Sequence, residues 1–249
     1  MSEEYMSYSQ FKSFCDCPAC AMARIRGEWN PPMTEALLVG SYVDQEFTGT
    51  DETRIEWLKQ YGDRIYKKNG EPYAYIGKAA QAIDAVKRQP LMMHYLDGEH
   101  QREFKGVIAG VPFHGFVDIY KQGEFIADLK YVKDLRSPNL FESLVHYYKY
   151  DIQGAIYREL IRQETGETLP YYLVIVTKES IPRVAVANIS DADLNIALGE
   201  VERRAPYFQS IKDGKEPEMR CEQCDYCAST AILEKPIDSN LLGMGGIIK

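Results

Sequence analysis

The sequence predicts a single mixed α/β (α+β) domain, and three observations support this fold class. The 249 residues suffice for one large domain with a substantial buried core. Apolar residues recur at helical spacing towards both ends, whereas the centre alternates with a period of two. The chain shows neither an internal repeat nor a low-complexity linker. Its 45% hydrophobic and 27% charged residues are ordinary for a globular protein, so disorder is excluded as its main state.

Helices are predicted in the first 90 residues. The segment 7–27 begins with serines that can cap a helix and carries apolar residues at helical spacing, with a break expected at Pro18. Three further helices are predicted over residues 34–47, 52–61 and 78–88.

The central region, rich in Phe, Val, Ile and Tyr, predicts strands. An antiparallel meander is expected over residues 103–108, 111–120 and 124–132, with turn signals between the strands. The remaining elements are predicted as a helix over 140–165, strands over 171–177 and 183–189, and a helix from Ser190 to about Lys212.

The charge balance limits the function classes. With 29 Lys and Arg against 37 Asp and Glu, the formal net charge is −8, which argues against coating nucleic acid by bulk charge. A local site whose carboxylates bind metal ions remains compatible with this net charge. No apolar run approaches the roughly 20 residues of a membrane span, and the N-terminus lacks the regions of a signal peptide. We therefore expect a cytoplasmic protein with no membrane partner.

Two neighbouring strands carry acids within apolar runs. In the segment 124–132, alternation places Asp128 and Lys130 on one face, and both faces carry apolar residues. A strand covered on both sides desolvates these charges, which costs several kcal/mol for each unpaired charge. Asp118 interrupts the preceding strand in the same way, and the turn at 121–123 would bring it towards Asp128.

Paired carboxylates and a nearby lysine suggest metal chemistry on phosphate. Two carboxylates close together repel each other unless a divalent cation neutralises them, and oxygen ligands suit Mg²⁺ or Mn²⁺. Lys130 could hold an attacking water or stabilise charge on phosphate oxygens. A plain ion pair between Asp128 and Lys130, with Asp118 supporting the turn, is the simpler alternative.

Five motifs in one order resemble the PD-(D/E)xK nuclease superfamily, in its RecB-like branch. They are Ser7-Tyr-Ser9-Gln-Phe11 with Cys17-Pro18, Leu38-Val-Gly40-Ser-Tyr-Val-Asp44, Gly115-Phe-Val-Asp118, Ile126-Ala-Asp128-Leu-Lys130 and Asp151-Ile-Gln153-Gly-Ala-Ile-Tyr157. The likeness covers roughly residues 6–233 and is closest to phage and prophage exonucleases. It implies a restriction-endonuclease-like core at about 34–190, with a central mixed sheet flanked by helices.

The resemblance also implies an activity. A chain of this kind would be a metal-dependent DNA exonuclease that hydrolyses phosphodiester bonds at linear DNA ends, in phage recombination or DNA processing, by two-metal-type activation of water. The partners consistent with it are linear duplex DNA, a phage single-strand annealing protein and further copies of the chain. Strand polarity, and duplex or single-strand preference, are not implied.

Residue roles follow from the same resemblance. Asp118 and Asp128, with Asp44 and the Leu129 carbonyl, would hold one or two Mg²⁺ or Mn²⁺ ions, and Lys130 would orient the attacking water.

Two of the implied roles have open alternatives. Gln153 and Tyr157 are four residues apart and share one helix face, where they could contact phosphate or a terminal base. An exposed polar helix face is the alternative for this pair. Glu46 is the alternative to Asp44 as the acid that completes the metal site.

All six cysteines lie near the chain ends, at positions 15, 17, 20, 221, 224 and 227. In a cytosolic protein such clusters are first interpreted as metal ligands. Three thiolates lie at two-residue intervals in Cys221-x-x-Cys224-x-x-Cys227, and a fourth ligand must come from elsewhere.

The cysteine pattern resembles that of helicase-associated and CRISPR-adaptation nucleases, in which one N-terminal cysteine joins three C-terminal ones around a [4Fe–4S] cluster. Cys17, before Pro18, occupies the matching position. Segments 7–27 and 213–233 would then form a metal-bound clamp. The open alternatives are a structural Zn²⁺, Cys15 or Cys20 in place of Cys17, and unliganded thiols.

A function of another class also fits the sequence. The chain could be a non-catalytic DNA-end-binding or assembly module with a purely structural metal centre. The acids at 118 and 128 and the lysine at 130 count against this alternative. A nuclease acting on single-stranded DNA or on RNA differs only in its substrate.

Overall fold

A computed structural model describes residues 5–232 and Pro236; the Gly-rich C-terminal tail lies outside these residues. The chain divides into two compact units. A central unit comprises Pro32–Gly106 and His114–Glu200, and an end unit comprises Met1–Pro31, Val107–Phe113 and Val201–Lys249. The expectation of one domain over residues 1–249 stays a prediction.

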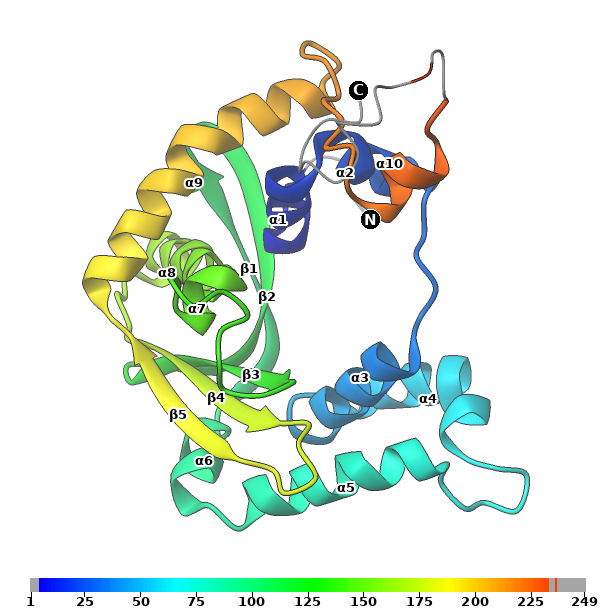
Figure 1. The fold of residues 1–249 in the computed structure, drawn as a ribbon. Helices are drawn as coiled ribbons and strands as arrows, with labels where there is room; N and C mark the ends of the chain where they lie inside the picture. The colour runs from blue at the N-terminus through cyan, green and yellow to red at the C-terminus, as the bar shows by residue number, and fades with distance from the viewer. Residues whose placement is uncertain (1–4, 233–235, 237–249) are drawn as a thin grey trace. The chain divides into compact units, whose positions relative to one another are not determined.

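A five-stranded mixed sheet organises the fold, and its strands lie in sequence order (Figure 1). The strands are β1 (Glu99–Ile108), β2 (Val111–Lys121), β3 (Phe125–Val132), β4 (Tyr171–Thr177) and β5 (Val184–Ile189). β2 and β3 are antiparallel, β3 and β4 parallel, and β4 and β5 antiparallel. The parallel pair requires a crossover, which the helices between β3 and β4 provide. The predicted mixed sheet flanked by helices is thus confirmed.

Four helices of the central unit pack into one cluster on one face of the sheet (Figure 1). They are α3 (Glu35–Phe47), α4 (Asp51–Ile65), α5 (Ala74–Lys87) and α6 (Pro90–Tyr95). Their buried side chains, such as Leu38 and Ile76, form one core cluster with Ala127 and Leu129 of β3 and Val174 of β4. This is the face opposite to Asp128, as the predicted alternation requires.

Helix α8 (Tyr150–Thr165) lies on the other face of the sheet (Figure 1). Ile152, Ile156 and Leu160 are buried there. The helix approaches β4 closely at Gly154, where an added Cβ would lie 2.8 Å from Cδ1 of Tyr171. A glycine is needed at this point because any side chain would push α8 away from the sheet.

The end unit contains α1 (Tyr8–Asp16), α2 (Pro18–Ile25), the second half of α9 (Asp191–Lys212) and α10 (Asp225–Ser229). Phe11 and Phe14 of α1 pack on Phe208. Their ring centroids lie 5.2 and 5.3 Å, respectively, from the ring centroid of Phe208. The predicted break at Pro18 is present. Cys17 ends α1 and caps α2, and its thiol accepts the Cys20 N–H.

Several element predictions were wrong in detail. The helix predicted over 140–165 is divided into α7 (Leu144–Tyr147) and α8, because Lys149 has a left-handed backbone with φ of 60°. Strand β1 begins at Glu99 rather than at residue 103. Helices α6 and α10 were not predicted. Pro90 follows α5 and is also the first residue of α6. At the first position of a helix its missing N–H loses no helical hydrogen bond.

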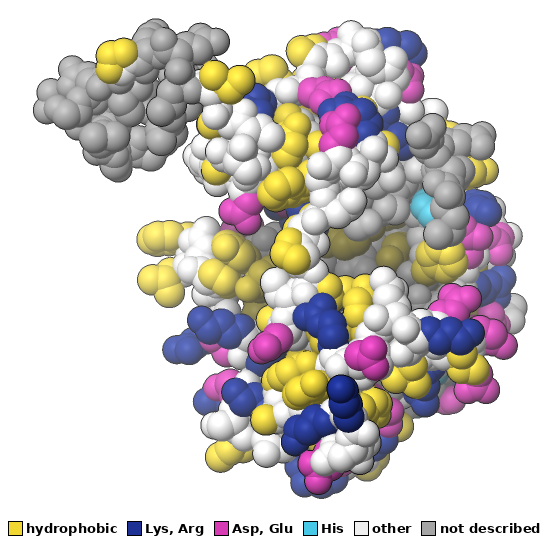
Figure 2. Space-filling model, turned by 90° about the vertical axis from the view of Figure 1, so that its right-hand side faces the viewer, with side chains coloured by type: hydrophobic (Ala, Val, Ile, Leu, Met, Phe, Trp, Pro, Cys, Tyr) yellow, Lys and Arg dark blue, Asp and Glu magenta, His cyan; other side chains and the backbone are white. Residues whose placement is uncertain are grey.

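The surface carries both signs of charge. On the face shown in Figure 2, described basic and acidic side chains are intermingled rather than separated into regions of one sign. Within residues 5–232, no helix combines the length and apolar character needed to cross a bilayer.

Candidate active site and cysteine centre

Asp118 and Asp128 lie opposite each other where strands β2 and β3 part. The backbone pairing of the two strands runs to Ile119 and Ala127, one residue short of the two acids. Beyond this pairing, the acceptor is the Asp118 carboxylate: the Leu129 N–H donates to its Oδ2 at 3.3 Å. The predicted approach of the two carboxylates is therefore found, and Leu129 lies beside them.

Asp128 is 1% exposed and connects to Lys130 and Gln153. Gln153 Nε2 donates to Asp128 Oδ1 at 2.8 Å, and Lys130 Nζ donates to Gln153 Oε1 at 2.9 Å. Lys130 Nζ also lies 2.5 Å from Asp128 Oδ2. The two groups form an ion pair, although the angle of approach is not that of a hydrogen bond. The carboxylates of Asp118 and Asp128 supply oxygen ligands, which are the ligands that a divalent cation such as Mg²⁺ prefers.

Gln153 and Tyr157 share one face of α8, as their spacing predicts. Gln153 Nε2 lies 3.3 Å from the Tyr157 hydroxyl, and both side chains are buried. The ring of Tyr157 packs against the backbone of Gly115, where an added Cβ would lie 2.6 Å from Tyr157 Cε1. Gly115 is thus required so that the α8 residues can reach the acids on β2 and β3. The pair is not an exposed polar helix face.

Asp44 interacts electrostatically with this group from α3. Its side chain is accessible to solvent, yet the surrounding protein and the charge of Asp128 raise its pKa to about 7, against the opposing influence of Lys130. Burial, followed by the charge of Asp128, raises the pKa of Asp118 to about 8. The charged forms of Asp44 and Asp118 are thus disfavoured beside Asp128, and a cation bound among these carboxylates would stabilise them.

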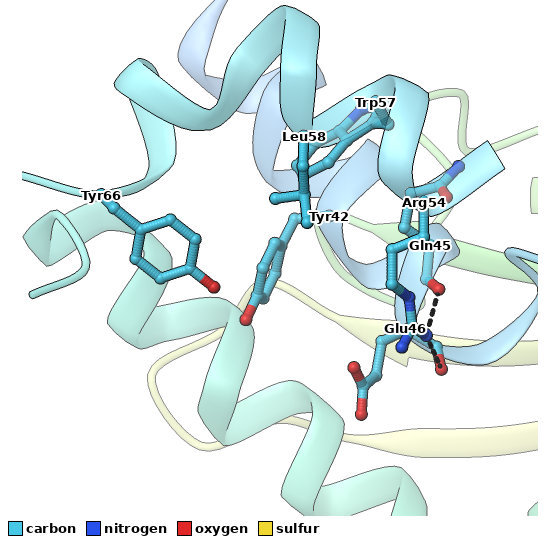
Figure 3. A pocket seen from close by; sticks show the side chains of 7 residues that line it. All are labelled: Tyr42, Gln45, Glu46, Arg54, Trp57, Leu58 and Tyr66. Carbon is cyan, nitrogen blue, oxygen red and sulfur yellow. Dashed lines mark hydrogen bonds between the residues drawn. The ribbon is translucent and has the colours of Figure 1, made fainter. Parts of the chain in front are cut away.

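Glu46, the alternative to Asp44, has a different environment. Its Oε1 lies 2.5 Å from Lys87 Nζ on α5. It also lines a cavity of about 150 Å³ (Figure 3). The other residues of this cavity are Tyr42, Gln45, Arg54, Trp57, Leu58 and Tyr66. Asp44, and not Glu46, is the α3 acid whose charge interacts with the acids on the strands.

Three residues border the site without having been predicted as part of it. Gln101 Nε2 donates to Asp118 Oδ1 at 3.0 Å, and its backbone has a left-handed φ of 52°. The Tyr150 ring centre lies 4.9 Å from Lys130 Nζ. Burial lowers the pKa of Lys178, and the charge of Asp44 partly opposes this shift. The predicted strand began two residues after Gln101, so the sequence offered no signal for it.

The raised pKa of Asp118 predicts a pH-dependent stability change. In the folded protein Asp118 keeps its proton up to about pH 8, whereas its usual pKa is 3.8. The stability that this group contributes is therefore fully present below pH 3.8 and is lost as the pH rises to about 8. In buffer free of divalent ions, Asp118→Asn should therefore stabilise the protein by about 1–3 kcal/mol at pH 9 and by little at pH 5. Asp118 is only half-buried, so solvent screens part of the effect of its charge. Urea unfolding at both pH values measures the difference.

Asp134→Asn is the matched control, since hydrogen bonds from Arg136 lower the pKa of Asp134. This substitution should not stabilise the protein at high pH. An Asp118→Asn effect that is the same at both pH values would contradict the assignment.

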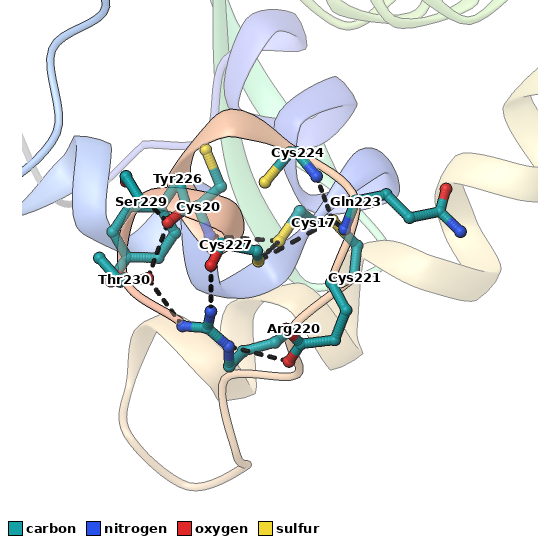
Figure 4. A network of polar contacts seen from close by, with 11 residues as sticks. Cys17, Cys20, Arg220, Cys221, Gln223, Cys224, Tyr226, Cys227, Ser229 and Thr230 are labelled. Carbon is teal, nitrogen blue, oxygen red and sulfur yellow. Dashed lines mark hydrogen bonds and ion pairs between the residues drawn. The ribbon is translucent and has the colours of Figure 1, made fainter. Parts of the chain in front are cut away.

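Four of the six cysteines gather in the end unit (Figure 4). The thiol sulfurs of Cys17, Cys221, Cys224 and Cys227 all lie within 4.8 Å of one another. The shortest separations are 3.6 Å from Cys17 to Cys227 and 3.9 Å from Cys221 to Cys227. The predicted joining of the two chain ends by cysteines is confirmed, with Cys17 rather than Cys15 or Cys20 as the N-terminal member.

Local hydrogen bonds shape the C-terminal cysteine loop. Burial opposes ionisation of Cys221, but the N–H groups of Gln223 and Cys224 donate to its sulfur, and together with neighbouring thiols they lower its pKa to about 7. Arg220 donates to the Cys227 carbonyl at 2.7 Å and to Glu222 Oε1 at 2.9 Å (Figure 4). These bonds hold the loop in a form that presents its thiols together.

Comparisons with known proteins place the fold and the family of the chain. No curated protein matches the sequence. A crystal structure of a protein from Eubacterium rectale, named "Putative exonuclease", has a TM-score of 0.87 and 33% identity to this chain. The similarity covers 98% of this chain and 94% of the other. Residues 7–230 match the family described as "PDDEXK-like domain of unknown function (DUF3799)", and the chain therefore belongs to this family of PDDEXK-like domains.

Proposed function

We propose that the chain is a metal-dependent DNA exonuclease that hydrolyses phosphodiester bonds at linear DNA ends. The observation that carries the proposal is the connected group of Asp118, Asp128, Lys130 and Gln153 at the point where β2 and β3 part. A PDDEXK-like family and the similarity to a protein named as an exonuclease support it.

In this proposal, Asp44, Asp118 and Asp128 hold Mg²⁺ or Mn²⁺, with the Leu129 carbonyl as a further ligand. The ions supply positive charge to the scissile phosphate and lower the pKa of a bound water, as in two-metal sites. The Lys130 ammonium stands beside Asp128, where it can orient the attacking water and stabilise charge on the phosphate oxygens.

Gln153 positions the lysine, since its amide joins Lys130 to Asp128. Tyr157, in contact with Gln153, adds an aromatic ring to the same face of α8. In the proposal these two residues fix the direction of the ammonium and contact the phosphate or terminal base.

End-labelled duplexes test the proposal. Wild-type protein should release nucleotides from linear DNA with Mg²⁺ or Mn²⁺, leave covalently closed circles intact, and be inactive without a divalent ion. The labelled end that disappears first gives the polarity. Tight DNA binding without cleavage under any metal would instead support a non-catalytic DNA-end-binding module. Cleavage of circles would show an endonuclease.

We further propose that Cys17, Cys221, Cys224 and Cys227 hold a structural metal centre. Zinc bonds to sulfur at about 2.3 Å in a tetrahedron, which places the sulfurs roughly 3.8 Å apart. The sulfur separations of 3.6 and 3.9 Å support this alternative. A [4Fe–4S] cluster, implied by the sequence resemblance, needs a wider cage because four irons lie between the thiolates.

Metal analysis of anaerobically purified protein separates the two centres. We expect a colourless solution with one zinc per chain. A brown solution that absorbs near 400 nm and contains four irons per chain would establish the cluster instead.

A further inference from the structure

The ammonium of Lys130 contacts an aromatic ring as well as Asp128 and Gln153. It lies over the ring of Tyr150, with Nζ 4.9 Å from the ring centre. This is inside the distance of about 6 Å within which the face of an aromatic ring attracts a cation. The Lys130 side chain is only 18% exposed, and Tyr150 is half-buried. Because such an attraction is strongest where water is excluded, the ring helps to hold the ammonium.

The backbone that carries Tyr150 departs from the usual rules for a helix start. Lys149, the N-cap of α8, has a left-handed φ of 60°, and its side chain makes no capping hydrogen bond. Left-handed residues are usually Gly, Asn or Asp, and N-caps are usually Ser, Thr, Asp or Asn. A lysine is also disfavoured at the positive end of a helix dipole. Such departures concentrate where function requires a particular geometry, and the residue placed by this one is Tyr150.

Tyr148, the residue that ends α7, supports the ring of Tyr150. The two rings are stacked, with centroids 5.6 Å apart and planes inclined by 22°. The ring of Tyr150, and not its hydroxyl, makes both of these contacts. Burial raises the pKa of Tyr150 to about 12, against the opposing charge of Lys130, so the ring belongs to a neutral phenol at neutral pH. All these residues lie in the central unit.

A neutral ring is well suited to hold a cation beside phosphate. Asp128 pairs with Lys130, and in the proposed function it also binds a metal ion, so two cations share this carboxylate. A further carboxylate at Lys130 would hold the ammonium, but its negative charge would repel the DNA phosphate. The face of an aromatic ring attracts the ammonium through its quadrupole and carries no net charge. It can therefore hold the lysine without opposing the substrate.

We propose that Tyr150 is a positioning residue, which holds the Lys130 ammonium through a cation–π contact in the orientation needed for hydrolysis. The inference rests on the proposed function, and it gives Tyr150 no direct contact with DNA. Tyr150 and Gln153 lie three residues apart in the first turn of α8, and both contact the same ammonium. The start of this helix thus orients a lysine that belongs to β3.

Removal and weakening of the ring test this role. Tyr150→Leu should lower kcat on a linear duplex by about tenfold and keep KM within about twofold, whereas Tyr150→Phe should keep both within about twofold. Phenylalanine with one, two or three ring fluorines at position 150 should lower kcat stepwise, because each fluorine weakens the attraction of the ring for a cation. The same series at Phe208, whose ring centre lies 5.0 Å from Cζ of Arg204 in α9, is the matched control and should leave kcat unchanged.

An NMR measurement without DNA or metal separates this inference from the proposed function. The ring current of Tyr150 should shift the ε-methylene signal of Lys130 upfield in wild type but not in Tyr150→Leu, and absence of the signal from Lys130→Ala assigns it. A flat fluorine series would overturn the positioning role, as would a Tyr150→Leu variant with wild-type kcat, a raised KM at unchanged kcat, or a missing upfield shift. If wild type cleaves no DNA, the proposed function fails, while the shift still decides whether the ring holds the lysine.

Discussion

Asp128→Ala and Lys130→Ala should each reduce DNA hydrolysis by about a thousandfold or more, the scale seen when a group that stabilises transition-state charge is removed. Asp128 is a buried acid at the centre of the contacts with Lys130 and Gln153, so its loss removes both a proposed metal ligand and the partner of the lysine. The rate of nucleotide release from an end-labelled duplex at saturating Mg²⁺ measures the effect.

Two acids on α3 provide a matched control for these variants. Asp44→Ala should lower activity strongly and raise the Mg²⁺ concentration needed for half-maximal rate. Glu46→Ala, two residues further along the helix, removes only the ion pair with Lys87 and should stay within about threefold of wild type. Full activity of Lys130→Ala, with an unchanged pH profile, would contradict the assigned mechanism.

Loss of the metal centre should have the largest effect on stability. Four thiols that lie within 4.8 Å of one another join segments about 200 residues apart in the chain. Cys227→Ala should therefore reduce the free energy of unfolding by about 3 kcal/mol or more and lower Tm by roughly 6–12 °C, because folding and metal binding are coupled. Thermal unfolding followed by circular dichroism, together with metal content, measures both changes.

The control for this experiment is Cys15→Ala. Cys15 lies on α1 and is not one of the four clustered thiols, so this variant should keep both its metal and its Tm. A Cys227→Ala protein with wild-type Tm and wild-type metal content would show that the four thiols are only packed together.

The sequence predicted the acids of the site because strand alternation is a short-range rule. Asp128 and Lys130 are two residues apart, and the turn at 121–123 is short enough to place Asp118 opposite Asp128 without knowledge of the rest of the fold. Gln101 could not be predicted in this way. Its amide reaches Asp118 only because one residue within β1 takes a left-handed backbone, which no local pattern in the polar segment 99–102 indicates.

The cysteines show the same limit. Their restriction to the chain ends predicted a shared centre, but three N-terminal cysteines within six residues were all candidates for the fourth ligand. The choice depends on how α1 ends. Cys17 takes an extended backbone between two helices, which turns its thiol towards Cys227 at 3.6 Å. The proposed choice of zinc rests on the separations between the sulfurs, which the spacing of the cysteines in the sequence does not give.

The position of the four thiols along the chain has a consequence for biosynthesis. Cys17 is made first, and the first of its partners, Cys221, is made 204 residues later, followed by Cys224 and Cys227. A chain grows at about 5–20 residues per second, so Cys17 waits roughly 10–40 seconds for the other three ligands. If these thiols hold the proposed metal, its capture must await residue 227, because a product that stops before residue 221 has only one of the four thiols.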